Sequence, residues 1–263
     1  MARFALLVSL VTLFVATSPA QTTPVSDPQA LSLVAKSMAA MTGGISIIDV
    51  TLNANVAGLI GSDIETGTAI LSAKGTGESR VDFQLNSGNR SELRNTLTGL
   101  PQGTWTGPKT ASTPIAMHNL WTNACWFFPA LSDLSGANLG VVLSYVGLES
   151  RSGVFVQHLR SNVYSISAIN LTAASLVQTL STTDFFLDAS SLLPVAIGFN
   201  VHPDGDAGVD IPVEIRFSNY QSIGKAMVPM HLQKYLNGGI TLDLVITSVS
   251  PNSGLLDTVF NLP

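Results

Sequence analysis

The sequence predicts an α+β protein that is mainly β, with one large antiparallel sheet whose single apolar face is covered by helices. Apolar and polar residues alternate along about ten short segments, and a period of two is typical of strands with one buried and one wet face. Turns rich in glycine separate these segments, which favours a meander or barrel-like sheet over alternating strands and helices. Only two or three segments have the spacing of an amphipathic helix.

Composition excludes some classes of partner. The 263 residues are 46% hydrophobic and only 11% charged, whereas a globular domain carries about 25% charged residues. The 12 lysines and arginines do not cluster and the net charge is −5, so the basic stripe of a nucleic-acid-binding protein is missing. A mildly acidic chain also gains nothing electrostatically at an anionic lipid surface.

The first 20 residues, MARFALLVSLVTLFVATSPA, predict a secretory signal peptide. Arg3 precedes an apolar run from Phe4 to Ala16, and small residues lead to a cleavage site after Ala20. The run is short for a membrane span of about 20 residues, so a retained N-terminal anchor is the less favoured alternative. We therefore expect a single domain over residues 21–263, periplasmic or extracellular, without a transmembrane anchor after cleavage.

The mature chain is expected to open with a helix and continue with strands. Ser26 or Asp27 can cap a helix that starts at Pro28 and ends at Gly43-Gly44. Its apolar stripe would comprise Leu31, Val34, Met38 and Met41. The alternation predicts strands around residues 48–56, 66–74, 80–86, 90–97 and 103–107.

The middle of the chain differs. Thr113-Pro114 is a helix-start signal, and apolar residues from Met117 to Leu131 keep helical spacing, so we expect a helix there. The segment holds the only cysteine, Cys125, which we expect to be a buried, inert thiol because one cysteine cannot form an internal disulfide. Its aromatic side chains are either core or the lining of a cavity.

The second half returns to alternation. Strands are expected around residues 141–148, 154–164, 184–188, 195–201, 209–217, 230–235 and 240–249, with a helical or polar insertion at 167–179.

From Gly140 to Pro263, the order of strands and turns resembles the periplasmic lipoprotein-carrier superfamily that includes LolA and LolB. The matching runs are YVGLESRSGVFVQHLRS, DFFLDASSLLPVAIGF, IPVEIRFSNYQSIGKAMVPMHL and LVITSVSPNSGLLDTVFNLP. The resemblance implies an open half-barrel closed by helices over an apolar cavity that holds acyl chains. It also implies, for other relatives, envelope stress sensors that bind proteins. In the carriers an arginine on a cavity strand helps latch the helical lid, and Arg80, Arg90 and Arg94 lie in predicted strands without a motif that selects one of them.

No catalytic, metal-binding or cofactor-binding motif is found. The four histidines lack metal-ligand spacing, and neither a Gly-x-Ser-x-Gly elbow nor a phosphate-binding loop occurs. The aspartates of HPDGDAGVD have a sufficient role in a Pro-Asp-Gly turn. Carboxylate pairs formed only in space leave no local trace, so a hydrolase stays the third hypothesis.

The first hypothesis is a binding protein that holds a lipid or an acyl chain between its sheet and its helices. The predicted cavity residues are Leu71, Phe83, Trp121, Phe127, Phe128, Phe199, Ile215 and Leu244. The alternative is an interaction or sensor module of the cell envelope with the same fold but a filled core. Packing separates the two hypotheses, because large aromatics that fill the cavity favour the module and an unfilled apolar volume favours the carrier.

Overall fold

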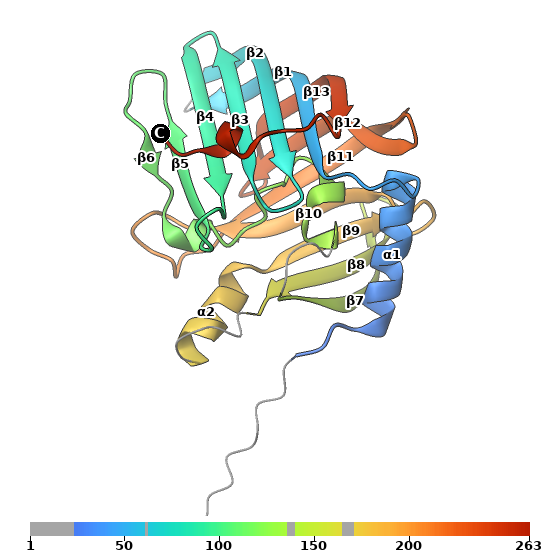
Figure 1. Ribbon diagram of the computed structural model, residues 1–263. Helices are drawn as coiled ribbons and strands as arrows, with labels where there is room; N and C mark the ends of the chain where they lie inside the picture. The colour runs from blue at the N-terminus through green and yellow to red at the C-terminus, as the bar shows by residue number, and fades with distance from the viewer. Residues whose placement is uncertain (1–23, 61–62, 136–139, 165–170) are drawn as a thin grey trace, which may run out of the picture.

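A computed structural model describes residues 24–60, 63–135, 140–164 and 171–263 (Figure 1). The predicted signal peptide and its cleavage site after Ala20 lie outside the described residues. No helix in the described ranges is long and apolar enough to cross a membrane. The α-helices are α1 (Pro28–Thr42) and α2 (Leu171–Leu180), and the short 3-10 turns are η1 (Met117–Asn119), η2 (Pro129–Leu131), η3 (Asp133–Ser135) and η4 (Asp257–Phe260). The strands are β1 (Asp49–Ile60), β2 (Asp63–Lys74), β3 (Ser79–Leu85), β4 (Gly88–Asn95), β5 (Gln102–Thr106), β6 (Thr113–Pro114), β7 (Val141–Arg151), β8 (Val154–Val163), β9 (Thr183–Asp188), β10 (Pro194–Val201), β11 (Ile211–Ile223), β12 (Ala226–Leu236) and β13 (Gly239–Pro251).

All these strands belong to one antiparallel sheet that curls without closing, so the predicted fold class is confirmed (Figure 1). The strand order is β6-β5-β4-β3-β2-β1-β13-β12-β11-β10-β9-β8-β7. The two halves of the chain join where β1 pairs with β13, in a register that sets Val50 opposite Pro251. Register shifts in β7 and β10, and in β13 where it pairs with β1 and with β12, supply the bulges that bend such a sheet.

The predicted alternation places one apolar face inside the curl. On β1, Val50, Leu52, Ala54 and Val56 are buried while Asn53 and Asn55 are exposed. The same period buries Ala69, Leu71 and Ala73 on β2 and Val213, Ile215 and Phe217 on β11. Residues of both halves form one continuous core on the concave face.

Helix α1 begins where predicted, because the Asp27 carboxylate accepts hydrogen bonds from the N–H groups of Gln29 (2.7 Å) and Ala30 (3.4 Å). It packs against β12 and the edge strand β7. The residues just before α1 cover that edge, because Asp27 N donates to Leu143 O and Leu143 N donates to Ser26 Oγ. The predicted stripe is shifted at its start, because Ala30 is buried and Leu31 is 48% exposed.

The prediction of a helix between Thr113 and Leu131 is wrong. The segment instead forms the two-residue strand β6 and then the isolated turns η1, η2 and η3. The physical reason is topological: β6 and β7 lie at opposite edges of the sheet, so the chain between them crosses the whole concave face. A single helix would bury one stripe, whereas this segment is surrounded by core, and side chains such as Asn123 and Ser132 satisfy its backbone N–H groups.

The stretch DFFLDASSLLPVAIGF forms the hairpin of β9 and β10, which is part of the sheet. One carboxylate organises its turn. Asp188 Oδ1 accepts hydrogen bonds from the N–H groups of Ser190 (3.0 Å) and Ser191 (2.7 Å) and from both serine hydroxyls. The Ser190 hydroxyl and the Ser191 N–H hold the pKa of Asp188 below its usual value. Leu192 takes a left-handed conformation (φ 58°) at the end of this turn.

We expect Asp188→Ala to lower the free energy of unfolding by about 1–2 kcal/mol at neutral pH, because the turn loses its acceptor. A carboxylate with a depressed folded pKa stabilises the fold above its unfolded pKa of about 3.9, and this contribution disappears as pH falls through the folded value. The difference between wild type and Asp188→Ala in urea unfolding should therefore shrink below about pH 4. Asp188→Asn keeps an acceptor and is the matched control, so an equal loss in both variants at neutral pH would contradict this account.

The end of α1 depends on a glycine for two separate reasons. Gly43 has a positive φ of 58°, and a Cβ at this position would overlap the backbone oxygen of Lys225. Its neighbour Gly44 also has a positive φ, 80°, but a Cβ there would meet nothing within 4 Å.

We expect Gly43→Ala to destabilise the protein more than Gly44→Ala. The second variant carries only the conformational cost of about 1 kcal/mol, whereas the first also pushes α1 away from the turn between β11 and β12. Thermal unfolding of the two variants measures the difference. Equal midpoints would mean that the contact with Lys225 contributes nothing.

Candidate ligand-binding site

Most of the predicted cavity residues are packed into the core. Six of the eight predicted residues are buried in one continuous cluster: Leu71, Phe127, Phe128, Phe199, Ile215 and Leu244. Phe127 and Phe128 come from the crossing segment and are at most 2% exposed. The crossing segment, residues 115–135, lies between the two halves of the curled sheet, where its turns are drawn in green in Figure 1. The centre of the concave face is therefore filled by aromatic side chains.

The structure separates Phe83 and Trp121, the other two predicted residues. Phe83 is partly buried, packs against the core and lines an apolar pocket. Trp121 lines a different pocket beside Arg94, Thr122 and Asn123. The helix that would have placed Trp121 on the same face as Phe128 does not form, so the two rings lie in different surroundings.

An apolar pocket of about 360 Å³ stays open toward one end of the concave face. Trp126 contributes one wall; it is 4% exposed and meets the Phe127 ring edge-on, with ring centroids 5.4 Å apart. The other apolar walls come from β3, β12 and β13: Val81, Phe83, Leu85, Leu236 and Leu242. The volume falls at the lower end of the range of about 300–1,000 Å³ typical of small-molecule sites.

Three charged residues also line this pocket, and the apolar alternation did not predict them. They are Arg90 and Glu92 on β4 and Lys234 on β12. The signal was present in GNRSELRN, where Arg90, Glu92 and Arg94 recur at steps of two and therefore share one face of the strand. The concave side of β4 is thus charged, although the neighbouring strands are apolar there.

Arg94 ties β4 to the crossing segment. Its Nε lies 2.7 Å from Glu92 Oε1, and its Nη1 donates to Asn119 O (3.2 Å) and to Thr122 Oγ1 (2.9 Å). Arg80, in contrast, pairs with Asp82 and donates to Val259 O in the C-terminal segment. Of the arginines on β3 and β4, Arg94 is the one that bonds to the segment filling the cavity.

The charges of Glu92 and Lys234 influence each other across the pocket. Burial by itself would raise the pKa of Glu92, but Arg94 and Lys234 hold it below its usual value. Burial lowers the pKa of Lys234, helped by Arg94 and opposed by Glu92. The Lys234 ammonium stands 5.1 Å from the centroid of the Trp126 ring, so a cation–π contact supports it.

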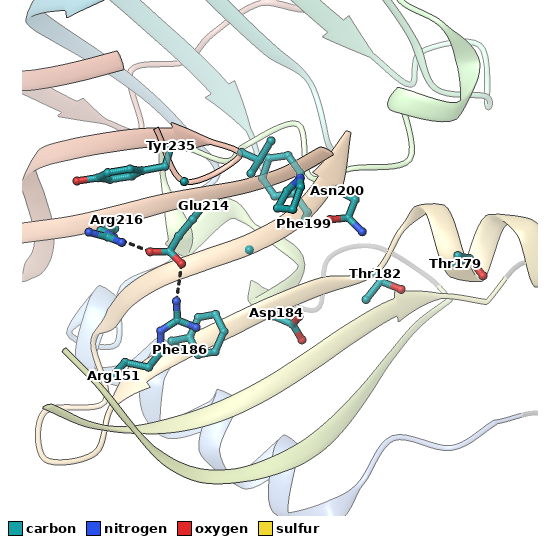
Figure 2. Close-up of a pocket in the computed structure, with 14 residues that line it drawn as sticks. Arg151, Thr179, Thr182, Asp184, Phe186, Phe199, Asn200, Glu214, Arg216 and Tyr235 are labelled. Atoms are coloured by element: carbon teal, nitrogen blue, oxygen red, sulfur yellow. Dashed lines mark hydrogen bonds and ion pairs between the residues drawn. The ribbon is translucent and has the colours of Figure 1, made fainter. Parts of the chain in front are cut away.

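A second pocket of about 310 Å³ lies on the outer face of the sheet, over Gly198 (Figure 2). Glu214 accepts hydrogen bonds from both Arg151 and Arg216, as the dashed lines in Figure 2 mark. The Arg151 guanidinium stacks 3.7 Å above the Phe186 ring. The cations that face Glu214 are thus paired within the groove.

Asp184, at the same groove, accepts hydrogen bonds from Arg160 (2.8 Å) and His158 (2.9 Å). Burial alone would raise its pKa, but these two partners hold it below its usual value. The Asp184 carboxylate is therefore stabilised in its charged form by two neighbouring side chains.

One serine on the sheet lies beside a histidine–aspartate pair. Ser218 Oγ lies 3.2 Å from His231 Nδ1, and His231 Nε2 lies 2.9 Å from Asp243 Oδ1, in a line across β11, β12 and β13. No group of three or more His, Cys, Asp or Glu side chains gathers as a metal site within the described ranges. Cys125 is buried, and burial raises the pKa of its thiol, as expected for an inert side chain.

Comparison with known proteins identifies the fold. No family model and no curated protein sequence matches the chain. Among solved structures, a domain named for outer membrane lipoprotein sorting from Vibrio parahaemolyticus superposes with a TM-score of 0.56 at 12% identity, covering 89% of this chain and 96% of its own. A LolA superfamily protein from Nitrosomonas europaea gives 0.55 at 12% identity and coverages of 89% and 97%. A DUF1329 family protein from Desulfovibrio piger gives 0.55 at 14% identity and coverages of 91% and 98%. The resemblance seen in the second half of the sequence is therefore confirmed for the fold of nearly the whole chain, which is that of the LolA-like half-barrels.

Proposed function

We propose that this protein binds an apolar ligand, a lipid or an acyl chain, in the pocket between its sheet and Trp126. In this proposal it is a non-enzymatic binding protein, secreted into the periplasm or to the exterior after cleavage of its signal peptide. The observation that carries the proposal is the apolar pocket of about 360 Å³ left open beside a filled core. A fold shared with a domain named for lipoprotein sorting supports the same role.

The driving force would be burial of apolar surface, about 25 cal/mol per Å². An acyl chain gains about 0.8 kcal/mol for each methylene that leaves water. The pocket is small, so it suits one chain rather than several. Phe127 and Phe128, which were predicted to line the cavity, are packed into the core instead.

The second candidate function is a protein-interaction module of the cell envelope. The buried rings of Phe127 and Phe128 favour it, because they fill the centre of the concave face. The groove around Arg151 and Phe186 would then be a surface for a partner.

Native mass spectrometry of residues 21–263, beside organic extraction of the same sample, separates the two candidates. A stoichiometric co-purified lipid supports the binding protein. A mass free of ligand, unchanged after incubation with phospholipids and acylated peptides, supports the interaction module and contradicts our proposal.

Filling the pocket should abolish binding without unfolding the protein. Gly58 lines the pocket, and a Cβ on it would meet only ordinary contacts, 3.6 Å from Thr241 O and 3.7 Å from Leu242 Cδ1. We expect Gly58→Leu to lower the affinity for a bound acyl chain by at least about tenfold, since several methylenes lose their place. Ala57→Leu, one residue away and directed to the other face, is the matched control. Unchanged binding by Gly58→Leu would show that the ligand sits elsewhere.

The hydrolase hypothesis can be tested at Ser218, His231 and Asp243. Ser218 is exposed on the outer face, and its cross-strand neighbours continue into a polar ladder in which Gln233 also donates to Asp243 (2.7 Å). Such pairs stabilise a wet sheet face without chemistry. We expect Ser218→Ala to leave any hydrolysis of p-nitrophenyl esters at the wild-type level. A complete loss of turnover in this variant alone would revive the enzyme.

A further inference from the structure

We infer that the apolar pocket selects amphiphiles with one acyl chain and an anionic head group, which Arg90 and Lys234 would bind. This inference rests on the proposed function and names the ligand class for the same site. It adds recognition of head-group charge to the recognition of chain length and shape that an apolar pocket provides.

The charges that line the pocket do not balance. Arg90, Glu92 and Lys234 face it, and Glu92 is already matched by Arg94, whose Nε lies 2.7 Å from its carboxylate. Arg90 in turn lies 3.6 Å from Glu65, so Arg90, Arg94 and Lys234 together face two carboxylates and one positive charge is in excess at the pocket. The chain as a whole carries a net charge of −5, so this positive region is a local feature and not a consequence of overall composition.

Arg90 is the more informative of the two cations. Its Nε is buried and has no hydrogen-bond partner among the described residues. One terminal nitrogen lies 3.4 Å from Ser87 Oγ and 3.6 Å from Glu65 Oε1, which are long contacts. A buried charged donor without a partner is costly, and a guanidinium presents a planar fork that matches a carboxylate or a phosphate.

Lys234 reaches the same pocket from β12. In the described part of the chain, no hydrogen bond or salt bridge engages its ammonium, and its support is the face of the Trp126 ring, 5.1 Å away. Burial depresses its pKa, so the charged form is poorly stabilised in the free protein. A ligand anion would supply the missing partner, and the apolar chain behind it would exclude water from the pair.

Carboxylates and phosphates share this chemistry, so a fatty acid and a monoacyl phosphate are both candidate sources. The test uses four amphiphiles with the same dodecyl chain: dodecanoate, dodecyl phosphate, dodecanol and dodecyltrimethylammonium. Each is titrated below its micelle concentration against delipidated protein, residues 21–263, loaded with the neutral fluorescent probe 1-aminoanthracene. Displacement of the probe reports binding, and the first two ligands distinguish the two sources.

We expect at least one anionic ligand to bind about tenfold or more tightly than dodecanol, because charge-assisted hydrogen bonds are added to equal apolar burial. Arg90→Met and Lys234→Met should each reduce this preference, measured as the ratio of the dissociation constants of dodecanol and the anionic ligand, toward one. Lys36→Met removes an exposed lysine of α1 and is the matched control. Arg90→Gln and Lys234→Gln, with thermal unfolding as a check, replace any methionine variant that fails to fold.

The outcomes separate the two proposals. Equal affinities for the anion, the alcohol and the cation overturn the head-group inference and leave the proposed function standing. Tighter binding of dodecyltrimethylammonium also overturns it, because Glu65 or Glu92 would then dominate the pocket. If no amphiphile displaces the probe, the proposed function fails and the inference fails with it.

Discussion

The structure depends on one topological constraint: two consecutive strands lie at opposite edges of the sheet. β6 and β7 follow each other in the sequence, yet the whole strand order separates them. The chain between them must cross the concave face, most of which is apolar. This explains why Trp126, Phe127 and Phe128 occur together, and why their segment forms turns held by polar side chains instead of a helix.

The second structural requirement is the seam between the two halves of the chain. β1 and β13 pair along their length, and Asp49 fixes the corner where β13 ends. This carboxylate is 2% exposed and accepts hydrogen bonds from the N–H groups of Ser253, Gly254 and Leu255. Asn252 adds two more bonds across the seam, to Ile48 N and Ser46 O. Burying polar groups of this kind costs free energy unless they are hydrogen-bonded. These hydrogen bonds therefore specify one arrangement of the start of β1 and the end of β13.

The sequence predicted those parts of the fold that follow from local periodicity. The strands were predictable because a period of two assigns each residue to one face, as at Val50, Leu52 and Ala54. Helix α1 was predictable because Asp27, Pro28 and Gly43 mark its ends. The crossing segment was not, because its helical spacing is compatible with a helix while its true environment is set by strands far away in the sequence.

The candidate site shows the same division. Phe83 could be assigned to the pocket from its strand, whereas Trp121 was assigned by a helix that does not form. The cations were overlooked because an apolar face was expected on every strand, although Arg90, Glu92 and Arg94 occupy the equivalent positions of β4. Only the curl of the sheet, which sets β4 opposite β12, reveals that these charges meet Lys234.

A filled core and a ligand pocket are compatible in this molecule because Trp126 serves both. One part of its surroundings is Phe127 and the rest of the core, and another is the pocket wall beside Lys234. The aromatic cluster therefore fixes the width of the pocket, since close-packed rings do not yield to a larger ligand. The charged side of β4 sits at that fixed opening, where water is already partly excluded and an ion pair is stronger than in bulk solvent. In the proposed function, an apolar wall facing cations would discriminate between ligands by head group as well as by chain.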